Sequence, residues 1–360
     1  MKVFYSPEHQ VHDPENEFTN AGAIPYPECA RRATGIAATL SSDPSFEIEM
    51  PETIAPIALE AIHDTGYLHF LAQVYAGQRS HTVELTPTTF PSRGRGRRPV
   101  TLKAQAGYYA FDTTPLTPGT WDAALSAAGS ALTGADCLLE GARSAYALCR
   151  PPGHHAGRDY FGGYCYLNNA ALAAEKLAAH SRVALLDIDY HHGNGSQDIF
   201  YDSDQVFFVS IHADPDYQYP LYWGYADERG EGVGVGKTRN FPLPPNTGDK
   251  AYIETLDEAL HYVEDFAPKY LIVSSGLDIC REDPLGDWAI TTEGVAQIGE
   301  RIATAGVPTL LVQEGGYDLH NLGANVRQLL TAFIYTKSRK RLLIIIVAQY
   351  KTRHSQPIAK

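Results

Sequence analysis

The sequence has few cysteines and no long hydrophobic run. The five cysteines among its 360 residues are odd in number and form no Cys-x-x-Cys pair, so no disulfide framework is expected and the thiols are predicted to be reduced. No apolar run approaches the roughly 20 residues of a membrane span, and the N-terminal MKVFYSPEHQ lacks the apolar segment of a signal peptide. These absences predict a soluble, cytoplasmic protein without a membrane partner.

Positive charge is also scarce, except at the C-terminus. The chain has 29 basic and 42 acidic residues, and residues 335–360 contain seven of the basic ones and no acidic one. Residues 1–334 therefore carry 22 basic against 42 acidic side chains, a formal charge of −20. Such an acidic body argues against nucleic acid as a partner and attracts small cations.

Residues 1–334 are predicted to form a single domain, followed by a basic C-terminal tail, 335–360. No internal repeat or linker divides the first segment. Its stretch 86–99 is rich in Pro, Gly and Arg, which is typical of a long functional or solvated loop. The apolar run LLIIIVA in the tail is too short to cross a bilayer. The tail pattern is compatible with an extra strand or helix, an interaction arm or a poorly ordered end.

Five segments share one pattern, a strand-like apolar run that ends abruptly in polar residues. Ala- and Leu-rich stretches with helical spacing, such as 168–180 and 249–266, lie between several of them. This alternation predicts an α/β fold: a single-domain open parallel β-sheet with helices on both faces. Sites in such sheets form beyond the carboxyl ends of the strands, where all five polar clusters fall. The segments are SAYALCRPPGHH (144–155), RVALLDIDYHH (182–192), QVFFVSIHAD (205–214), YLIVSSGLD (270–278) and PTLLVQEGGY (308–317).

Acidic and histidine side chains follow one of these strands in the sequence DIDYHHGNG. Asp187, Asp189 and His191 project the same way if the strand persists, and two neighbouring carboxylates repel each other unless a cation lies between them. Asp278, at the end of another predicted strand, completes a set of oxygen and nitrogen ligands. Three protein ligands with one open position are typical of a catalytic zinc rather than a structural one.

Two histidines and a tyrosine are candidate catalytic groups. His154 and His155 follow RPPG, a stiff turn that would hold both rings at a fixed angle. Histidine transfers protons near neutral pH, typically for about 10²–10⁴-fold in rate. Tyr317 follows the flexible sequence EGG and can offer a phenol to a developing oxyanion. Together these groups predict hydrolysis at a metal ion.

Two alternative interpretations use the same segments. A strand end neutralised by salt bridges needs Lys or Arg nearby, and only Arg182 and Arg281 are close in the sequence. A cysteine hydrolase would place Cys149 or Cys165 beside the histidines. The convergence of polar groups at five strand ends favours a metal site over both.

The motifs RPPGHH, GGYCYLNN, DIDYHHGNG, SSGLD and EGGY, in this order, resemble the arginase–deacetylase superfamily, in particular its histone-deacetylase-like amidohydrolases. The resemblance covers roughly residues 1–333. GYYAFDTTPLTPGTW, HHGNGSQDIFY and GYADERGEG are most similar to the bacterial acetylpolyamine amidohydrolases. The resemblance implies that the chain has the arginase–deacetylase fold and is a metal-dependent deacetylase that acts on linear amides. The related ureohydrolases need two metals and an Asp-x-Asp pair where this chain has Asp278-Ile279-Cys280.

The resemblance implies one zinc ion per subunit, with Asp189, His191 and Asp278 as ligands. Iron(II) or cobalt would tolerate similar ligands. A structural potassium ion is also implied, bound by Asp187, Asp189, Ser210 and backbone carbonyl groups.

The resemblance also assigns catalytic roles. His155 would be the general base and acid, with His154 beside it, oriented by Asp187, and Tyr317 would polarise the acetyl carbonyl. Asn194 stands where many eukaryotic deacetylases have an aspartate that supports the second histidine. A neutral amide would stabilise a protonated His155 less than a carboxylate does.

For the substrate, the backbone of Gly163 would accept the amide N–H, and Tyr164 and Tyr219 would form the walls of the acyl-chain tunnel. These two wall positions are often phenylalanine, so their hydroxyls would make the tunnel mouth more polar. The implied substrates are small acetylated amines such as acetylated putrescine, cadaverine and spermidine. Acetyl-lysine peptides are the alternative substrates, and a catalytically silent acyl-amine binding module is the alternative of another class.

Residues 80–103 match, in place and length, a loop that in the acetylpolyamine enzymes reaches across a homodimer and narrows the entrance. A homodimer through this loop is therefore implied. The positive charge of the 80–103 loop does not suit a polycationic substrate. The arginines of the loop would therefore contact the acidic partner subunit and leave a carboxylate such as Glu84 near the mouth of the tunnel. The arginines are Arg93, Arg95, Arg97 and Arg98.

Overall fold

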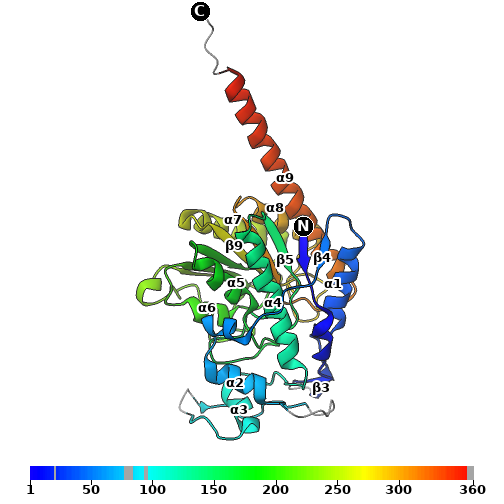
Figure 1. The fold of residues 1–360 in the computed structure, drawn as a ribbon, viewed down its shortest axis with the longest axis vertical. Helices are drawn as coiled ribbons and strands as arrows, with labels where there is room; N and C mark the ends of the chain where they lie inside the picture. The colour runs from blue at the N-terminus through cyan, green and yellow to red at the C-terminus, as the bar shows by residue number, and fades with distance from the viewer. Residues whose placement is uncertain (20–21, 77–83, 93–95, 355–360) are drawn as a thin grey trace, which may run out of the picture.

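An eight-stranded parallel β-sheet forms the centre of the protein (Figure 1). The structure is a computed structural model that describes residues 1–19, 22–76, 84–92 and 96–354, with side chains up to residue 338. The strands lie in the order β4-β1-β5-β10-β9-β6-β7-β8. Their bounds are β1 Lys2–Phe4, β4 Glu47–Glu49, β5 Ser144–Ala147, β6 Val183–Asp187, β7 Val206–Ala213, β8 Thr238–Leu243, β9 Tyr270–Ser275 and β10 Thr309–Gln313. A separate antiparallel hairpin pairs β2 (Asn16–Thr19) with β3 (Gly22–Pro25).

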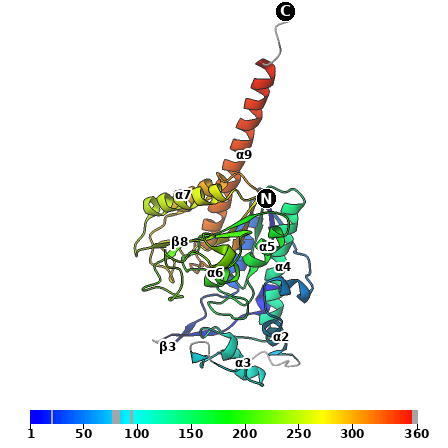
Figure 2. The ribbon, with the colours of Figure 1, turned by 90° about the vertical axis from the view of Figure 1, so that its left-hand side faces the viewer.

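Helices cover both faces of the sheet (Figures 1 and 2). Helices α4 and α5 pack on one face, and α1, α7, α8 and the start of α9 pack on the other. Side chains of β6 alternate between these two cores, with Leu185 in the first and Leu186 in the second. The predicted fold class is therefore confirmed. The helix bounds are α1 Arg31–Ser41, α2 Thr65–Gln73, α3 Leu102–Tyr109, α4 Thr120–Leu139, α5 Asn169–Ala178, α6 Asn194–Phe200, α7 Asp249–Phe266, α8 Thr292–Ala303 and α9 Leu322–His354.

The five predicted strand segments are β5, β6, β7, β9 and β10 of the sheet. All five are consecutive neighbours, in the order β5-β10-β9-β6-β7, and run parallel. Their carboxyl ends, with the polar residues that follow, therefore meet at one edge of the sheet. Three further strands, β1, β4 and β8, were not apparent from the sequence, because two have only three residues and the third is a half-buried edge strand.

Strand β6 ends at Asp187, so the expected continuation to His191 does not occur. Side-chain bonds to the backbone shape the next residues instead: Asp187 Oδ1 accepts the N–H of Asp189 at 3.1 Å, and Asp189 Oδ1 accepts the N–H of His191 at 2.9 Å. Such local bonds are how aspartate turns a chain away from a strand.

Helix α9 crosses the expected boundary at residue 334 without a break and extends away from the body in both views (Figures 1 and 2). Phe333 is fully buried. The Lys337 ammonium donates to the carbonyl oxygens of Arg143 (2.9 Å) and Val307 (2.8 Å). Helix α9 therefore still contacts the body at Lys337. Among the described residues, no helix combines the length and hydrophobicity needed to cross a membrane.

Shortening the chain at α9 tests which part of the tail the fold needs. A chain that ends after residue 338 keeps Phe333 and Lys337, so its melting temperature should change by no more than about 2 °C, as for other surface changes. A chain that ends after residue 332 loses both contacts and should melt several degrees lower, since losing a buried phenylalanine side chain costs about 3–5 kcal/mol. Thermal unfolding followed by circular dichroism measures both; equal melting temperatures would contradict the prediction.

Candidate active site

Asp189, His191 and Asp278 come together at the sheet edge, with one potential ligand atom from each lying within 4.8 Å of the others. Asp278 follows β9 and Asp189 follows β6, the neighbouring strand. Both carboxylates are fully buried. Burial and the adjacent Asp189 carboxylate raise the pKa of Asp278 to about 7, because burial and a neighbouring like charge both disfavour its ionised form.

The ion-pair partners of these carboxylates are histidines. Asp278 Oδ2 lies 2.9 Å from His191 Nδ1, and Asp189 Oδ2 lies 3.9 Å from His154 Nε2. Within the described part of the chain, no Lys or Arg forms a salt bridge with either carboxylate, and Arg182 stacks over the Phe266 ring instead. The salt-bridge interpretation therefore has no supporting contact here.

The two histidines of the RPPGHH turn have different partners. His154 Nδ1 contacts Asp187 Oδ2 at 3.0 Å, and His155 Nδ1 contacts Asn194 Oδ1 at 2.7 Å. Burial disfavours the imidazolium of His154, but Asp189 and Asp187 outweigh this and raise its pKa to about 10. Burial and then the positive His154 lower the pKa of His155 well below its usual value. A neutral His155 with Nδ1 donating to Asn194 keeps Nε2 free to accept a proton.

Tyr317 is held by the loop that follows β10. The backbone N–H of Gly315 donates to Asp189 Oδ2 at 2.8 Å, and the N–H of Tyr317 donates to the buried carboxylate of Asp283. A Cβ at Gly315 would lie 2.4 Å from Asp278 Oδ2, so the close approach of the ligand carboxylates requires glycine here. The Arg32 guanidinium stacks over the Tyr317 ring, 4.7 Å from its centroid.

A pocket of about 200 Å³ opens over these groups. It brings together His155, His191 and Tyr317 with the predicted wall residues Tyr164 and Tyr219 and with Gly163. The other lining residues are Glu17, Asp112, Thr113, Thr114, Pro115 and Leu285.

Gly163 is tightly enclosed in this pocket. Its φ is +54°, and a Cβ there would lie 2.3 Å from the His155 ring, so only glycine fits beside the histidine. Its N–H donates to Asp112 Oδ2 at 2.8 Å, and its carbonyl accepts the thiol of Cys165 at 3.3 Å. The carbonyl has a second lone pair available for a substrate N–H.

Two carboxylates of the pocket, Glu17 and Asp112, were missed in the sequence. Glu17 accepts the Tyr164 hydroxyl at 2.7 Å, and Asp112 accepts the Tyr219 hydroxyl at 2.7 Å. The part of the pocket lined by the two tyrosines, which was expected to be polar, is therefore acidic as well. Asp112 belongs to the motif GYYAFDTTPLTPGTW, which was a usable signal, whereas Glu17 lies on the β2–β3 hairpin and has no distinguishing sequence context.

The predicted entrance loop 80–103 is described only in part, since residues 80–83 and 93–95, including Arg93 and Arg95, lie outside the described residues. Glu84 accepts the backbone N–H of Glu15 and does not line the pocket. Among the described residues of this chain, the carboxylates that line the pocket are Glu17 and Asp112, and a place for Glu84 near the entrance of a dimer stays a prediction. Arg98 donates to the Tyr109 hydroxyl at 3.3 Å.

The predicted potassium ligands are neighbours in the sheet, because Asp187 of β6 pairs in register with Ser210 of β7. Both are fully buried. The Ser210 hydroxyl lies 2.7 Å from His212 Nδ1.

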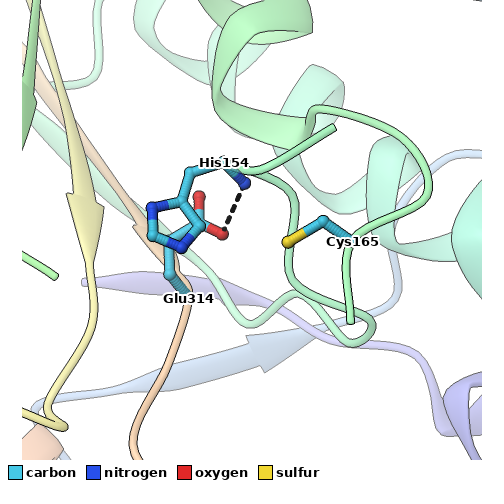
Figure 3. A group of neighbouring side chains, drawn as sticks. All are labelled: His154, Cys165 and Glu314. Carbon is cyan, nitrogen blue, oxygen red and sulfur yellow. Dashed lines mark hydrogen bonds between the residues drawn. The ribbon is translucent and has the colours of Figure 1, made fainter. Parts of the chain in front are cut away.

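Cys149 and Cys165 have no nucleophilic setting. Burial raises the thiol pKa of Cys149 and of Cys165 well above the usual value, which keeps both protonated and weakly reactive. Cys280, at the position where a ureohydrolase has a second aspartate, accepts a bond from Asn325 Nδ2 at 3.4 Å. A second buried group, His154, Cys165 and Glu314, also has potential ligand atoms within 4.8 Å of one another (Figure 3).

The proteins that this chain resembles agree with the geometry of the site. A profile of the histone deacetylase domain matches residues 26–333, so the chain belongs to the histone deacetylase domain family. Acetylpolyamine amidohydrolase 1 of Pseudomonas aeruginosa is 44% identical over 342 residues, which cover 92% of this chain and 99% of that protein. The acetylpolyamine amidohydrolase of Mycoplana ramosa is 39% identical, with coverage of 92% and 98%.

A solved structure, the acetylpolyamine aminohydrolase from Burkholderia pseudomallei, superimposes with a TM-score of 0.89 at 39% identity. The match covers 93% of this chain and 99% of that one. The arginase–deacetylase fold expected from the motifs is thereby confirmed.

Proposed function

We propose that the protein is a metal-dependent deacetylase that removes the acetyl group from acetylated polyamines and related small acetylated amines. The observation that carries this proposal is the pocket itself. His155, His191 and Tyr317 line it, His191 as a member of the Asp189–His191–Asp278 group, and the carboxylates of Glu17 and Asp112 line it as well. The relatives that match over nearly their full length are named as acetylpolyamine amidohydrolases, which supports the same substrate class.

The residues of the Asp189–His191–Asp278 group fit a divalent metal ion. Two buried carboxylates and one imidazole offer the oxygen and nitrogen donors that zinc prefers, and among the described residues no Lys or Arg side chain pairs with either carboxylate. We propose that Asp189, His191 and Asp278 hold one zinc ion. Such an ion would polarise the acetyl carbonyl and activate a water molecule for attack.

The remaining groups of the site have complementary tasks. His155 is neutral and turned so that Asn194 occupies Nδ1, so Nε2 can take the proton from the attacking water and later deliver one to the departing amine. His154, anchored by Asp187, packs against it with ring centroids 4.0 Å apart. Tyr317 lines the pocket and can donate its hydroxyl to the developing oxyanion. The Gly163 carbonyl can accept the N–H of the scissile amide.

The acidic mouth explains why the substrate would carry a positive charge beyond the acetamide. A polyamine retains at least one ammonium group after acetylation, and an ammonium near a half-buried carboxylate is attracted more strongly than in bulk water. Burial raises the pKa of Glu17, while its bond from Tyr164 opposes the shift. A cationic substrate would favour the ionised form of this carboxylate.

Neutralising the mouth should weaken the binding of charged substrates. We expect Glu17→Gln and Asp112→Asn each to raise KM for acetylputrescine about tenfold, the size of one charge-assisted hydrogen bond, with little change in kcat. Steady-state kinetics measure both parameters. N-butylacetamide, which lacks the ammonium, is the control substrate and its KM should not change. An equal effect on both substrates would assign Glu17 and Asp112 to wall packing.

The decisive experiment for the function is acetate release by zinc-loaded protein from acetylputrescine, acetylcadaverine, acetylspermidine and an acetyl-lysine peptide, assayed in parallel. Turnover of the small amines with little activity on the peptide supports the proposal. Equal or faster turnover of the peptide would favour the alternative, a broader acetyl-lysine deacetylase. No turnover of any substrate would favour a silent acyl-amine binding module.

Three further assignments belong to this proposal: the first two rest on the sequence resemblance, and the third rests on the lack of a long apolar run in the sequence. We propose a potassium ion near Asp187 and Ser210, supported by their register as buried neighbours. A homodimer through the 80–103 loop and a cytoplasmic location stay predictions from the sequence. Potassium dependence of the melting temperature and sedimentation velocity test the first two.

A further inference from the structure

Glu314 lies fully buried beneath the turn that carries the two histidines, directly after β10. Its Oε2 accepts the backbone N–H groups of Gly153 at 2.7 Å and of His154 at 3.2 Å, the second of which is drawn in Figure 3. Its Oε1 accepts the hydroxyl of Ser274, from β9, at 3.1 Å. The mechanism proposed above gives Glu314 no task.

The position of Glu314 is itself fixed by its backbone. Its N–H donates to the carbonyl of Ser275 at 3.1 Å, and its own carbonyl accepts a bond from Arg32 Nη2 at 2.7 Å and another from Gln313 Nε2 at 3.1 Å. A side chain on such a rigid base can hold a neighbouring turn in place, because its own conformation has little freedom to lose.

The group His154, Cys165 and Glu314 has the residue types of a metal site, but its polar atoms already have partners. His154 Nδ1 contacts Asp187, Cys165 Sγ donates to the Gly163 carbonyl, and both Glu314 oxygens accept hydrogen bonds. A buried group whose hydrogen-bonding capacity is used in this way is explained without an ion.

We infer that Glu314 is a positioning residue: through Oε2 it fixes the backbone of the Gly153–His154 turn, and with it the angle at which His155 faces the pocket. Asp187 and Asn194 contact the Nδ1 atoms of the two rings, and Glu314 binds the backbone of the turn from which the rings extend. This inference rests on the proposed function, because it concerns the placement of the proton-transfer group.

Glu314 also joins the two halves of the site. It is three residues before Tyr317, on the loop whose Gly315 N–H is bound to Asp189, while its carboxylate holds the histidine turn that follows β5. The distance between the proton acceptor and the oxyanion donor is therefore set in part by one side chain. Misplacing a reacting group by about 1 Å can cost roughly a hundredfold in rate.

A matched pair of variants tests the inference. Glu314→Gln keeps an acceptor oxygen at the same place, and Glu314→Met keeps the length and removes it. We expect Glu314→Met to lower kcat for acetylputrescine about a hundredfold with KM unchanged, and Glu314→Gln to stay within about threefold of the unaltered protein. Ser274→Ala, which removes the contact to the other oxygen, is the control and should also stay within about threefold.

Other results would overturn the inference. Equal losses in both variants would mean that the charge of Glu314 acts and not its acceptor geometry; unchanged kcat in both would give it a purely structural role. A bound-metal content lower by one ion per chain in Glu314→Met would assign the group to ion binding. If the unaltered protein hydrolyses none of the substrates, the proposed function fails, and crystal structures of the two variants still decide whether the histidine turn moves in Glu314→Met alone.

Discussion

Replacing Tyr317 by phenylalanine is expected to lower kcat for acetylputrescine about a hundredfold or more. The hydroxyl is the group of Tyr317 that can donate to an oxyanion, and the loss of one such donor typically costs about 2.7–4 kcal/mol in the transition state. The ring itself should stay in place, because Arg32 stacks on it and Asp283 holds its backbone N–H. The loss should therefore fall on kcat and leave KM nearly unchanged.

Steady-state acetate release from the zinc-loaded variant measures this prediction. Tyr190→Phe is a suitable control, since it removes a phenol hydroxyl close to the site, one bound to Asp287 at 2.7 Å and outside the pocket. The control should keep at least about a third of the activity, as most single changes outside a site do. A change of less than about fivefold in Tyr317→Phe would remove its hydroxyl from the mechanism.

Replacing Asp278 by asparagine is expected to abolish both metal binding and turnover. The asparagine amide has nearly the same shape as the carboxylate but is neutral, so the metal loses one of its two negative ligands. Removing a residue that only supports a metal ligand already lowers metal affinity about 10- to 100-fold. We expect a loss of at least about a hundredfold in zinc affinity for this direct ligand, by the same comparison. Removal of the second buried charge ends its repulsion with Asp189 but also its ion pair with His191, so the metal-free variant should melt close to the metal-free unaltered protein.

Metal content after gel filtration, measured by mass spectrometry, and metal-free melting temperatures test this prediction separately from activity. Asp287→Asn is the matched control, because Asp287 is exposed and bonds to Tyr190 without joining the Asp189–His191–Asp278 group. It should retain one ion per chain. Full metal content in Asp278→Asn would mean that this carboxylate is not a ligand.

The sequence by itself determined the architecture and the edge at which the site lies. Near-continuous apolar runs such as RVALL can be buried only between two layers, which requires a parallel sheet covered by helices. Because parallel strands end at the same edge, polar residues after several runs had to converge there. The residues of the family motifs, Asp189, His191, Asp278 and Tyr317 among them, could therefore be named before the structure was known.

Other features were decided only by tertiary packing. Strand β6 ends at Asp187, because the carboxylates of Asp187 and Asp189 accept the backbone N–H groups two residues further on. In the resulting turn, the Asp187 side chain contacts His154, and Asp189 lies beside Asp278. No local pattern contains that choice, since the partners of each carboxylate come from other strands.

Glu17 and Asp112 show the same limit at the mouth. Their partners, Tyr164 and Tyr219, lie 147 and 107 residues away in the sequence. A hairpin with exposed residues, such as the one that carries Glu17, has no periodicity that points to a pocket. The chemistry of the site is encoded locally in motifs at strand ends, whereas the charge of the entrance depends on contacts that exist only once distant segments have packed together.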